Sequence, residues 1–221
     1  MNGQEIDDAF RSRVDDKAEP YGWSDEDLVV YRNEAVREYR RRIPLFDDST
    51  PEICEIAVTA SEARCSVDAR VIEVRRAKLG LATDPLLPYE RSELDYYRSG
   101  WQTETGTPEG YLETGDGDSI MIRLVPIPVV ADTLYLEVGR LPLEELELDA
   151  EPEVPLHDHF VLLDWMAHLA YQKQDVDTRD DKKSATWGAM FTSKVGPRPT
   201  SRGDGMRREM ARGPRRVRAH R

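Results

Sequence analysis

The stretch SIMIRLVPIPVVADTLYLEVGR, residues 119–140, holds the two clearest strand patterns in the chain. Apolar side chains stand at every second position in both halves of it, at Ile120, Ile122, Leu124, Leu134, Leu136 and Val138. This period of two is typical of strands with one buried face. Pro126-Ile127-Pro128 connects the halves, because proline cannot donate to a sheet ladder. The pattern predicts a pair of strands, 119–125 and 133–140, in a β-rich region.

The same period continues toward the N-terminus. Cys54, Ile56 and Val58 alternate with Glu55 and Ala57, and Val71-Ile72-Glu73-Val74 predicts a further strand. Ser92-Glu93-Leu94-Asp95 has the form of a capping box that opens a short helix through Tyr97 toward Trp101. Residues 51–150 are therefore expected to form a β-rich insertion.

Outside this insertion the apolar period changes to that of a helix. Asn2 with Glu5, and then Ser24-Asp25-Glu26-Asp27, predict the starts of two N-terminal helices, the second of which ends at Pro44. Residues 160–171 are apolar nearly all round, so this helix is expected at the centre of the core.

Thr178-Arg179-Asp180-Asp181 predicts the cap of a last helix, which ends at Gly196-Pro197. The apolar residues expected to face its core are Ala185, Trp187, Met190, Phe191 and Val195. Neither helical end of the chain hides its apolar face alone, so the two are expected to pack together. The predicted fold is α+β: a helical bundle from 1–50 and 151–197, and a β-rich insertion over 51–150.

Charge is divided unevenly along the chain. Residues 198–221 hold nine arginines against Asp204 and Glu209, a balance of +7, so residues 1–197 carry −19 of the total of −12. The arginines are Arg198, Arg202, Arg207, Arg208, Arg212, Arg215, Arg216, Arg218 and Arg221. This segment lacks periodic apolar residues and is expected to be disordered when alone. Docking on an acidic protein surface, contact with nucleic acid, and an inert tail all remain open for it.

Several functional classes find no support in the sequence. No apolar stretch approaches the ~20 residues of a membrane span, and the N-terminus has no secretory pattern, so no membrane partner is expected. Cys54 and Cys65 are too few for a disulfide scaffold and are expected to be buried thiols. No P-loop, dinucleotide fingerprint, G-x-S-x-G or HExxH motif occurs. We therefore expect no catalytic residues and no cofactor.

Two short motifs raise the question of a metal. His157 and His159 are two residues apart, and on a helix such side chains point ~200° apart and cannot share an ion. The run from Asp175 to Asp180 resembles a calcium loop, but it has Arg179 at a ligand position and Asp180 where glycine is required. We expect no metal site. Trp101, Trp165 and Trp187 are interpreted as core residues.

An ordered set of motifs over residues 20–197 resembles the adaptor proteins of tailed phages, also called head completion or tail-tubular proteins. The motifs are Trp23-Ser24-Asp25-Glu26, Asn33-Glu34-Ala35, Ile72-Glu73-Val74-Arg75-Arg76-Ala77, Leu94-Asp95 with Trp101, Gly106-Thr107-Pro108, Pro126-Ile127-Pro128 with Asp132-Thr133-Leu134, Arg140-Leu141-Pro142, Pro152-Glu153-Val154-Pro155, and Asp175 with Asp177. The resemblance implies a ring, typically of twelve copies, between portal and tail, with the genome passing through its centre.

The resulting hypothesis is a non-enzymatic connector that completes the head. Its expected partners are copies of itself, the portal protein and a tail or nozzle protein, while phage DNA passes without specific binding. The expected location is the neck of the virion, after assembly in the host cytoplasm. The nine arginines of the C-terminal segment are expected to dock on the portal. The alternative is a nucleic-acid-binding or regulatory protein that uses this segment as its contact.

Overall fold

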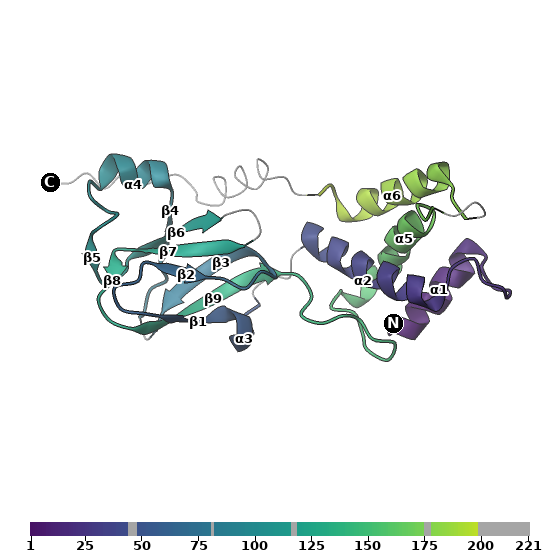
Figure 1. The fold of residues 1–221 in the computed structure, drawn as a ribbon, viewed down its shortest axis with the longest axis horizontal. Coiled ribbons are helices and arrows are strands. Elements are labelled where there is room, and N and C mark those ends of the chain that lie inside the picture. Colours follow the sequence, from purple (N-terminus) through teal and green to yellow (C-terminus); the bar gives the residue numbers. More distant parts are fainter. Residues whose placement is uncertain (44–47, 81, 116–118, 175–177, 199–221) are drawn as a thin grey trace. The chain divides into compact units, whose positions relative to one another are not determined.

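The computed structural model describes residues 1–43, 48–80, 82–115, 119–174 and 178–198. The helices are α1 (Gly3–Val14), α2 (Asp25–Arg42), α3 (Pro51–Cys54), α4 (Arg91–Tyr97), the short 3-10 helix η1 (Leu156–Asp158), α5 (His159–Ala170) and α6 (Asp181–Val195). The strands are β1 (Glu55–Val58), β2 (Arg64–Ser66), β3 (Val71–Leu79), β4 (Leu87–Tyr89), β5 (Thr105–Gly106), β6 (Gly110–Gly115), β7 (Ile120–Val125), β8 (Ile127–Pro128) and β9 (Asp132–Arg140). These elements form the α+β fold drawn in Figure 1.

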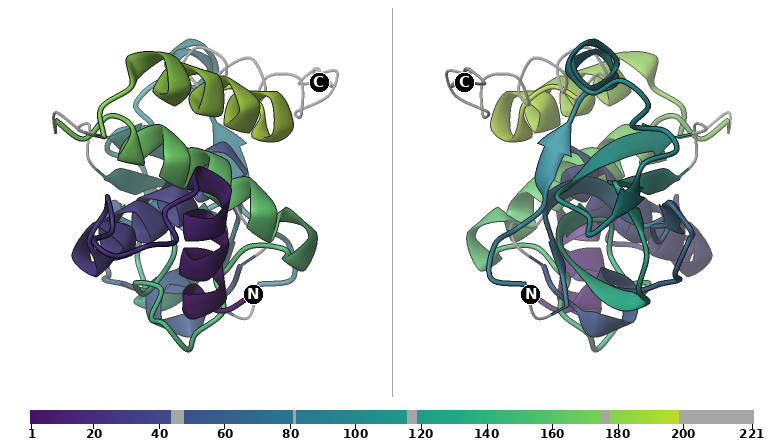
Figure 2. Two further views of the ribbon diagram at one scale, coloured as in Figure 1. Left: turned by 90° about the vertical axis from the view of Figure 1, so that its right-hand side faces the viewer. Right: turned by 90° about the vertical axis from the view of Figure 1, so that its left-hand side faces the viewer.

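The chain divides into two compact units. One takes the described residues of 1–42 and 146–221, and the other takes those of 43–145. In the first unit, α5 packs against α6 on one side and against α1 and α2 on the other (Figure 2, left). Trp23 supports this packing, since its indole Nε1 donates to the carbonyl of Ala170 at the end of α5.

Helix starts follow the expected capping chemistry in the first unit. The Asn2 side chain accepts from the backbone N–H of Glu5, whose carboxylate accepts from the N–H of Asn2. Ser24 and Asp27 exchange the same two contacts at the start of α2. Asp180 accepts from two N–H groups in the first turn of α6. These side chains pair N–H groups that have no partner within the helix.

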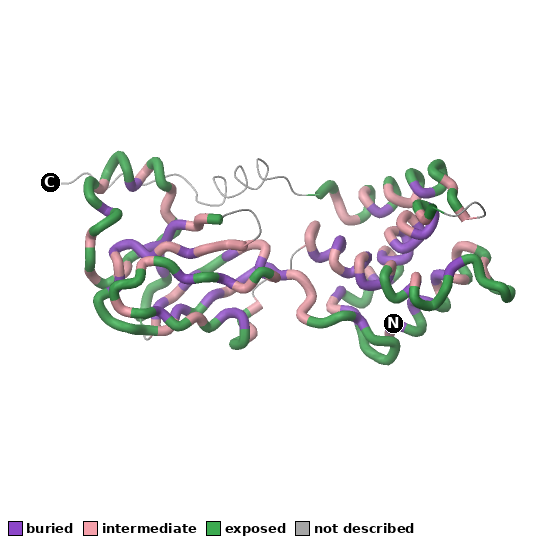
Figure 3. Tube along the Cα trace, viewed as in Figure 1, coloured by how far each residue is buried: buried purple, intermediate pink, exposed green. Residues whose placement is uncertain are grey.

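The second unit is a β-sandwich. One sheet has the order β1-β9-β3 and the other β2-β7-β6-β4, while β5 and β8 pair separately. Buried apolar residues from both sheets form one core, including Val74 and Leu136 from the first sheet and Ile122 and Leu124 from the second. Along β9, buried positions alternate with half-buried or exposed ones over residues 133–138, whereas β7 has only half-buried and buried positions (Figure 3). The right-hand view of Figure 2 faces this unit.

The two strands predicted at 119–125 and 133–140 lie in the β unit. Both predicted strands form, as β7 and β9, but they belong to different sheets. β9 pairs with β1 and β3, whereas β7 pairs with β2 and β6. Pro126-Ile127-Pro128 therefore carries the chain from one sheet to the other. Local alternation tells which face of a strand is buried, but not which strand lies beside it.

Three element predictions change in detail. Cys54 ends α3 instead of starting the strand, although its thiol is buried as expected. The short helix begins at Arg91, because Glu90 and Glu93 form its capping box in place of Ser92. The predicted strand at residues 71–74 extends to Leu79.

The two C-terminal helices bury other faces than the sequence pattern suggests. Phe160 on α5 is 60% exposed, so this helix is not buried all round. On α6, Ala185 and Met190 are exposed, while Ser184 and Phe191 are buried. Trp101 lies in a core, but Trp165 and Trp187 are only half-buried. Apolar residues outnumber the positions that packing partners cover, so some remain at the surface.

Candidate interaction surfaces

The arginine-rich segment begins at an anchored residue. Gly196, with φ of +97°, ends α6 in a conformation that favours glycine. Two residues later, Nη2 of Arg198 lies 2.9 Å from Oε2 of Glu38 on α2. The Glu38 side chain is only 2% exposed, whereas that of Arg198 is 58% exposed. The first arginine of the segment is therefore held on the helical unit.

Of the nine arginines predicted to dock on the portal, only Arg198 belongs to the described residues. The other eight lie outside them, namely Arg202, Arg207, Arg208, Arg212, Arg215, Arg216, Arg218 and Arg221.

Glu38 joins the C-terminal ends of two helices. Besides Arg198, it pairs with Arg42, whose Nε lies 2.9 Å from Oε1, and with Arg41 at 3.5 Å. Nη1 of Arg42 donates to Oγ1 of Thr192 at 2.9 Å and to the carbonyl of Gly196 at 2.8 Å. The exit of the C-terminal segment is thus tied to α2 by hydrogen bonds to charged groups, which are the stronger kind.

A second buried carboxylate connects three helices. Asp164 on α5 has a fully buried side chain that pairs with Arg13 of α1 at 2.5 Å and with Lys194 of α6 at 2.6 Å. Arg13 also lies over the ring of Trp187, 4.9 Å from its centroid. This role of Asp164 was not predicted from the sequence, in which Asp164 stands inside an apolar helical run. A charge inside an otherwise apolar run is the signal that could have indicated it, because such a charge needs partners.

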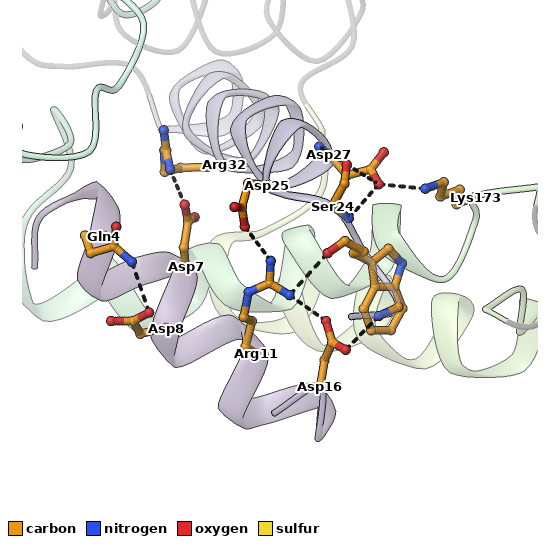
Figure 4. A network of polar contacts seen from close by, with 12 residues as sticks. Gln4, Asp7, Asp8, Arg11, Asp16, Ser24, Asp25, Asp27, Arg32 and Lys173 are labelled. Carbon is orange, nitrogen blue, oxygen red and sulfur yellow. Dashed lines mark hydrogen bonds and ion pairs between the residues drawn. The ribbon is translucent and has the colours of Figure 1, made fainter. Parts of the chain in front are cut away.

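Arg32 and Asp7 form a third buried pair, seen in Figure 4. Arg32 is 1% exposed, and it also donates through Nε and Nη2 to the carbonyl of Leu146, at 3.2 and 2.9 Å. Burial raises the pKa of the Asp7 carboxyl to about 6, against the attraction of Arg32 and Arg11. Asn33 accepts from the N–H of Leu146 at 2.6 Å. These contacts hold Leu146, where the chain re-enters the helical unit, against α2.

Polar contacts also close the loop between α1 and α2 (Figure 4). Arg11 donates to Asp16 and Asp25, each at 2.7 Å, and to the carbonyl of Trp23 at 3.2 Å. Lys173 pairs with Asp27 at 2.6 Å. Burial alone would raise the pKa of Asp27, but hydrogen bonds from Lys173 and Ser24 outweigh it and lower the pKa.

The β unit carries two exposed apolar features. Tyr96 and Tyr97 on α4 are 80% and 74% exposed, and their ring centroids are 4.6 Å apart. A groove of about 360 Å³ lies where the β3–β4 connection, the turn after β5 and the β8–β9 turn meet. Val129 and Val130 line it and are 55% and 70% exposed.

The motifs considered for metals are placed as follows. His159 is buried, with Nε2 at 2.9 Å from the carbonyl of Val154 and Nδ1 at 2.9 Å from the N-terminal nitrogen, whereas the His157 side chain is 81% exposed. Asp175 and Asp177 lie outside the described residues. Where the structure describes the chain, it holds no group of three His, Cys, Asp or Glu residues that could bind an ion.

Among the described residues, no helix is both long and apolar enough to cross a bilayer.

The structure thus has a basic segment that begins at the anchored Arg198 and exposed apolar side chains on the β unit. Exposed apolar side chains that gather in a patch are typical of surfaces that contact other macromolecules. A family model described as SU10 adaptor protein matches residues 1–218, and the chain belongs to this family. The resemblance to phage head-to-tail adaptors is thereby confirmed. No curated protein matches the chain.

Membership of this family gives the protein a phage structural adaptor role. Such a role implies contacts with other phage head and tail proteins and a place in the virion. Structural adaptor families of this kind are typically not enzymes.

Proposed function

We propose that the protein is a connector that forms a ring between the phage portal and the tail, completes the head and allows DNA to pass. The observation that carries this proposal is the family match over almost the whole chain. In this role the protein acts through interfaces and not through catalysis. Within it, the helical segments 1–50 and 151–197 form the ring body, and residues 51–150 form a β-rich insertion that presents surfaces to neighbours.

The division of charge supports this function. Residues 1–197 carry −19, and a lining of that sign repels phosphates, so DNA can slide through a channel without sticking. The C-terminal segment has the opposite sign and docks on an acidic surface of the portal. Arginine suits such docking because its planar guanidinium forms paired hydrogen bonds to carboxylates and is weakly hydrated.

The anchor at Glu38 supports portal docking by the segment. Arg198 is held on the helical unit, so the following arginines leave from a fixed point. Ordering a segment costs on the order of 1–2 kcal/mol per residue, more than one exposed ion pair returns. Docking therefore requires several arginines of the segment to pair at once.

The test of the ring is to mix the purified protein with the portal encoded by the same genome and to image the product by negative-stain electron microscopy. We expect a closed ring seated on the portal, with the twelve copies that the family resemblance implies. Free portal beside unassembled protein would contradict the proposal.

The test of the segment is deletion of residues 199–221, which retains the anchored Arg198. Circular dichroism should show an unchanged folded body, while portal binding should be lost. A matched control replaces the eight arginines of 202–221 by lysine, which keeps the charge but loses the planar donor pairs, and should bind more weakly than the unchanged chain. Unchanged portal affinity in the deletion would rule out docking by the segment. Loss of salt-dependent DNA binding instead would favour a nucleic-acid-binding protein.

A further inference from the structure

The groove on the β unit is lined by both apolar and acidic side chains. Pro85, Pro108 and Pro128 line it together with Val129 and Val130. Two adjacent valines with more than half of their surface in water are costly to leave uncovered, since burying apolar area is favourable by about 25 cal/mol per Å². Its volume of about 360 Å³ lies at the lower end of the range for ligand pockets. The groove therefore suits one or two small apolar side chains.

Carboxylates define the charge that this groove accepts. Asp84, Glu109 and Asp132 line it, and none of the described lining residues is a lysine or arginine. Glu109 is partly compensated, because Nη1 of Arg98 lies 3.2 Å from its Oε2. Within the described part of the chain, Asp84 and Asp132 form no ion pair. An occupant should thus bring apolar side chains flanked by cations.

One segment of this protein has that chemistry. In Pro214-Arg215-Arg216-Val217-Arg218, apolar residues stand three apart and three arginines surround them. The body as a whole has the opposite sign, because residues 1–197 carry −19. We propose that this pentapeptide binds the groove of a neighbouring copy, with Val217 and Pro214 against the valines and prolines and the arginines near the lining carboxylates.

The charge of the segment favours a neighbouring copy, and its length limits how far it can reach. From Arg198 to Val217 there are 19 steps, which span at most about 60 Å when extended at ~3.3 Å per residue. Bodies at −19 repel one another, and a segment of +7 that crosses from each copy to the next offsets this repulsion. This inference rests on the proposed function, because only a ring places the copies side by side. Arg202, Arg207, Arg208 and Arg212 remain available to bind the portal.

The groove is tested with a fluorescein-labelled peptide of residues 212–221 and the full chain, by fluorescence anisotropy without portal. We expect saturable binding that Asp84→Lys with Asp132→Asn weakens by about ten-fold or more. The matched control, Glu144→Lys with Glu147→Gln, makes the same change in net charge at exposed positions outside the groove and should leave the affinity within about two-fold. Equal losses in both variants would overturn the site, because charge alone would then explain binding.

A second peptide tests the apolar part of the contact. Val217→Ser with Pro214→Ser keeps every arginine, and we expect about ten-fold weaker binding because the side chains that fill the groove are lost. Equal binding of the two peptides would overturn insertion into the groove. The peptide experiments contain no portal. A negative result in them therefore does not affect the microscopy test of the ring, and peptide affinity can still be measured if no ring forms.

Cross-linking decides whether the contact is between copies. A chain with Val130→Cys and a differently tagged chain with Val217→Cys are assembled together on portal and oxidised, and we expect a cross-linked pair of the two tags. Cys54 and Cys65 should not interfere, because both are buried and burial raises the pKa of the Cys54 thiol to about 11. Thr186→Cys, exposed on α6, replaces Val130→Cys in the control and should give no pair. A cross-link only when both cysteines are on one chain would overturn the neighbouring copy.

Discussion

Buried carboxylates hold the helical unit together at single positions. Asp7, Glu38 and Asp164 each face one or more cations from another part of the chain. Burying a carboxylate costs free energy unless it is paired, and removing one partner leaves an uncompensated charge behind. Such sites therefore fix which helices meet more than they add to net stability.

Asp7 makes the stability of this unit depend on pH. Burial raises its pKa in the folded state from 3.8 to about 6, so the folded protein favours the neutral acid. The stability contributed by this preference is present below pH ~4 and is lost as the pH rises through ~6. We expect the advantage of the unchanged chain over Asp7→Asn, in free energy of unfolding from urea titration, to narrow between pH 4 and pH 7.

The opposite trend would identify a different dominant force. If attraction by Arg32 outweighs burial, the pKa of Asp7 in the folded state lies below its value in the unfolded state. The advantage of the unchanged chain over Asp7→Asn in free energy of unfolding then widens as the pH rises. Glu26→Gln serves as the control, because Glu26 is exposed on α2 and is not among the charges that shift the pKa of Asp7. It should change the pH profile little.

At the scale of elements, α5 shows how one helix is divided between core and surface. Leu162 and Met166 are fully buried, and Asp164 pairs with residues of α1 and α6. Phe160 and Leu156 are 60% and 72% exposed near its start. The apolar run thus forms a helix whose N-terminal end is exposed to solvent, because α1, α2 and α6 do not pack over that end.

This division predicts unequal costs for two truncations on one helix. Leu162→Ala should lower the free energy of unfolding by about 2–5 kcal/mol, since it leaves a cavity among packed helices. Phe160→Ala should change it by about 0.5 kcal/mol or less, since its ring is mostly in water already. Urea titration measures both. A larger loss at Phe160 would mean that its ring is covered in solution.

At the scale of the whole molecule, the net charge of each copy opposes the association of copies with one another. Each copy carries −12, divided into −19 over residues 1–197 and +7 over the last 24 residues. Copies placed side by side repel through their bodies, and this repulsion weakens as salt shortens the screening length. The basic segment and a basic partner surface both offset it.

We therefore expect the purified protein to be a monomer or weak oligomer that becomes a ring on the portal. Light scattering across a salt series measures the mass of the free protein, and a second series with portal measures the assembly. Deletion of residues 199–221 should reduce self-association further. A stable ring without portal, unaffected by salt, would contradict this expectation.

Much of this structure was determined by the sequence alone. Alternation predicted β3, β7 and β9, and helical period with caps predicted α1, α2, α5 and α6, because these signals depend on neighbouring residues. The ordered motifs also predicted the adaptor family. The capping of α4 by Glu90 was not predicted because two overlapping capping patterns lie within the six residues 90–95.

Only the tertiary structure decided the contacts between distant residues. β7 and β9 lie in different sheets, because strand neighbours are chosen by the joint packing of two sheet faces and not by local alternation. Glu38, separated from Arg198 by 160 residues, became a buried anchor. A charge pattern shows how many cations a segment carries, but the position of a carboxylate that pairs with one of them depends on how the helices fold together.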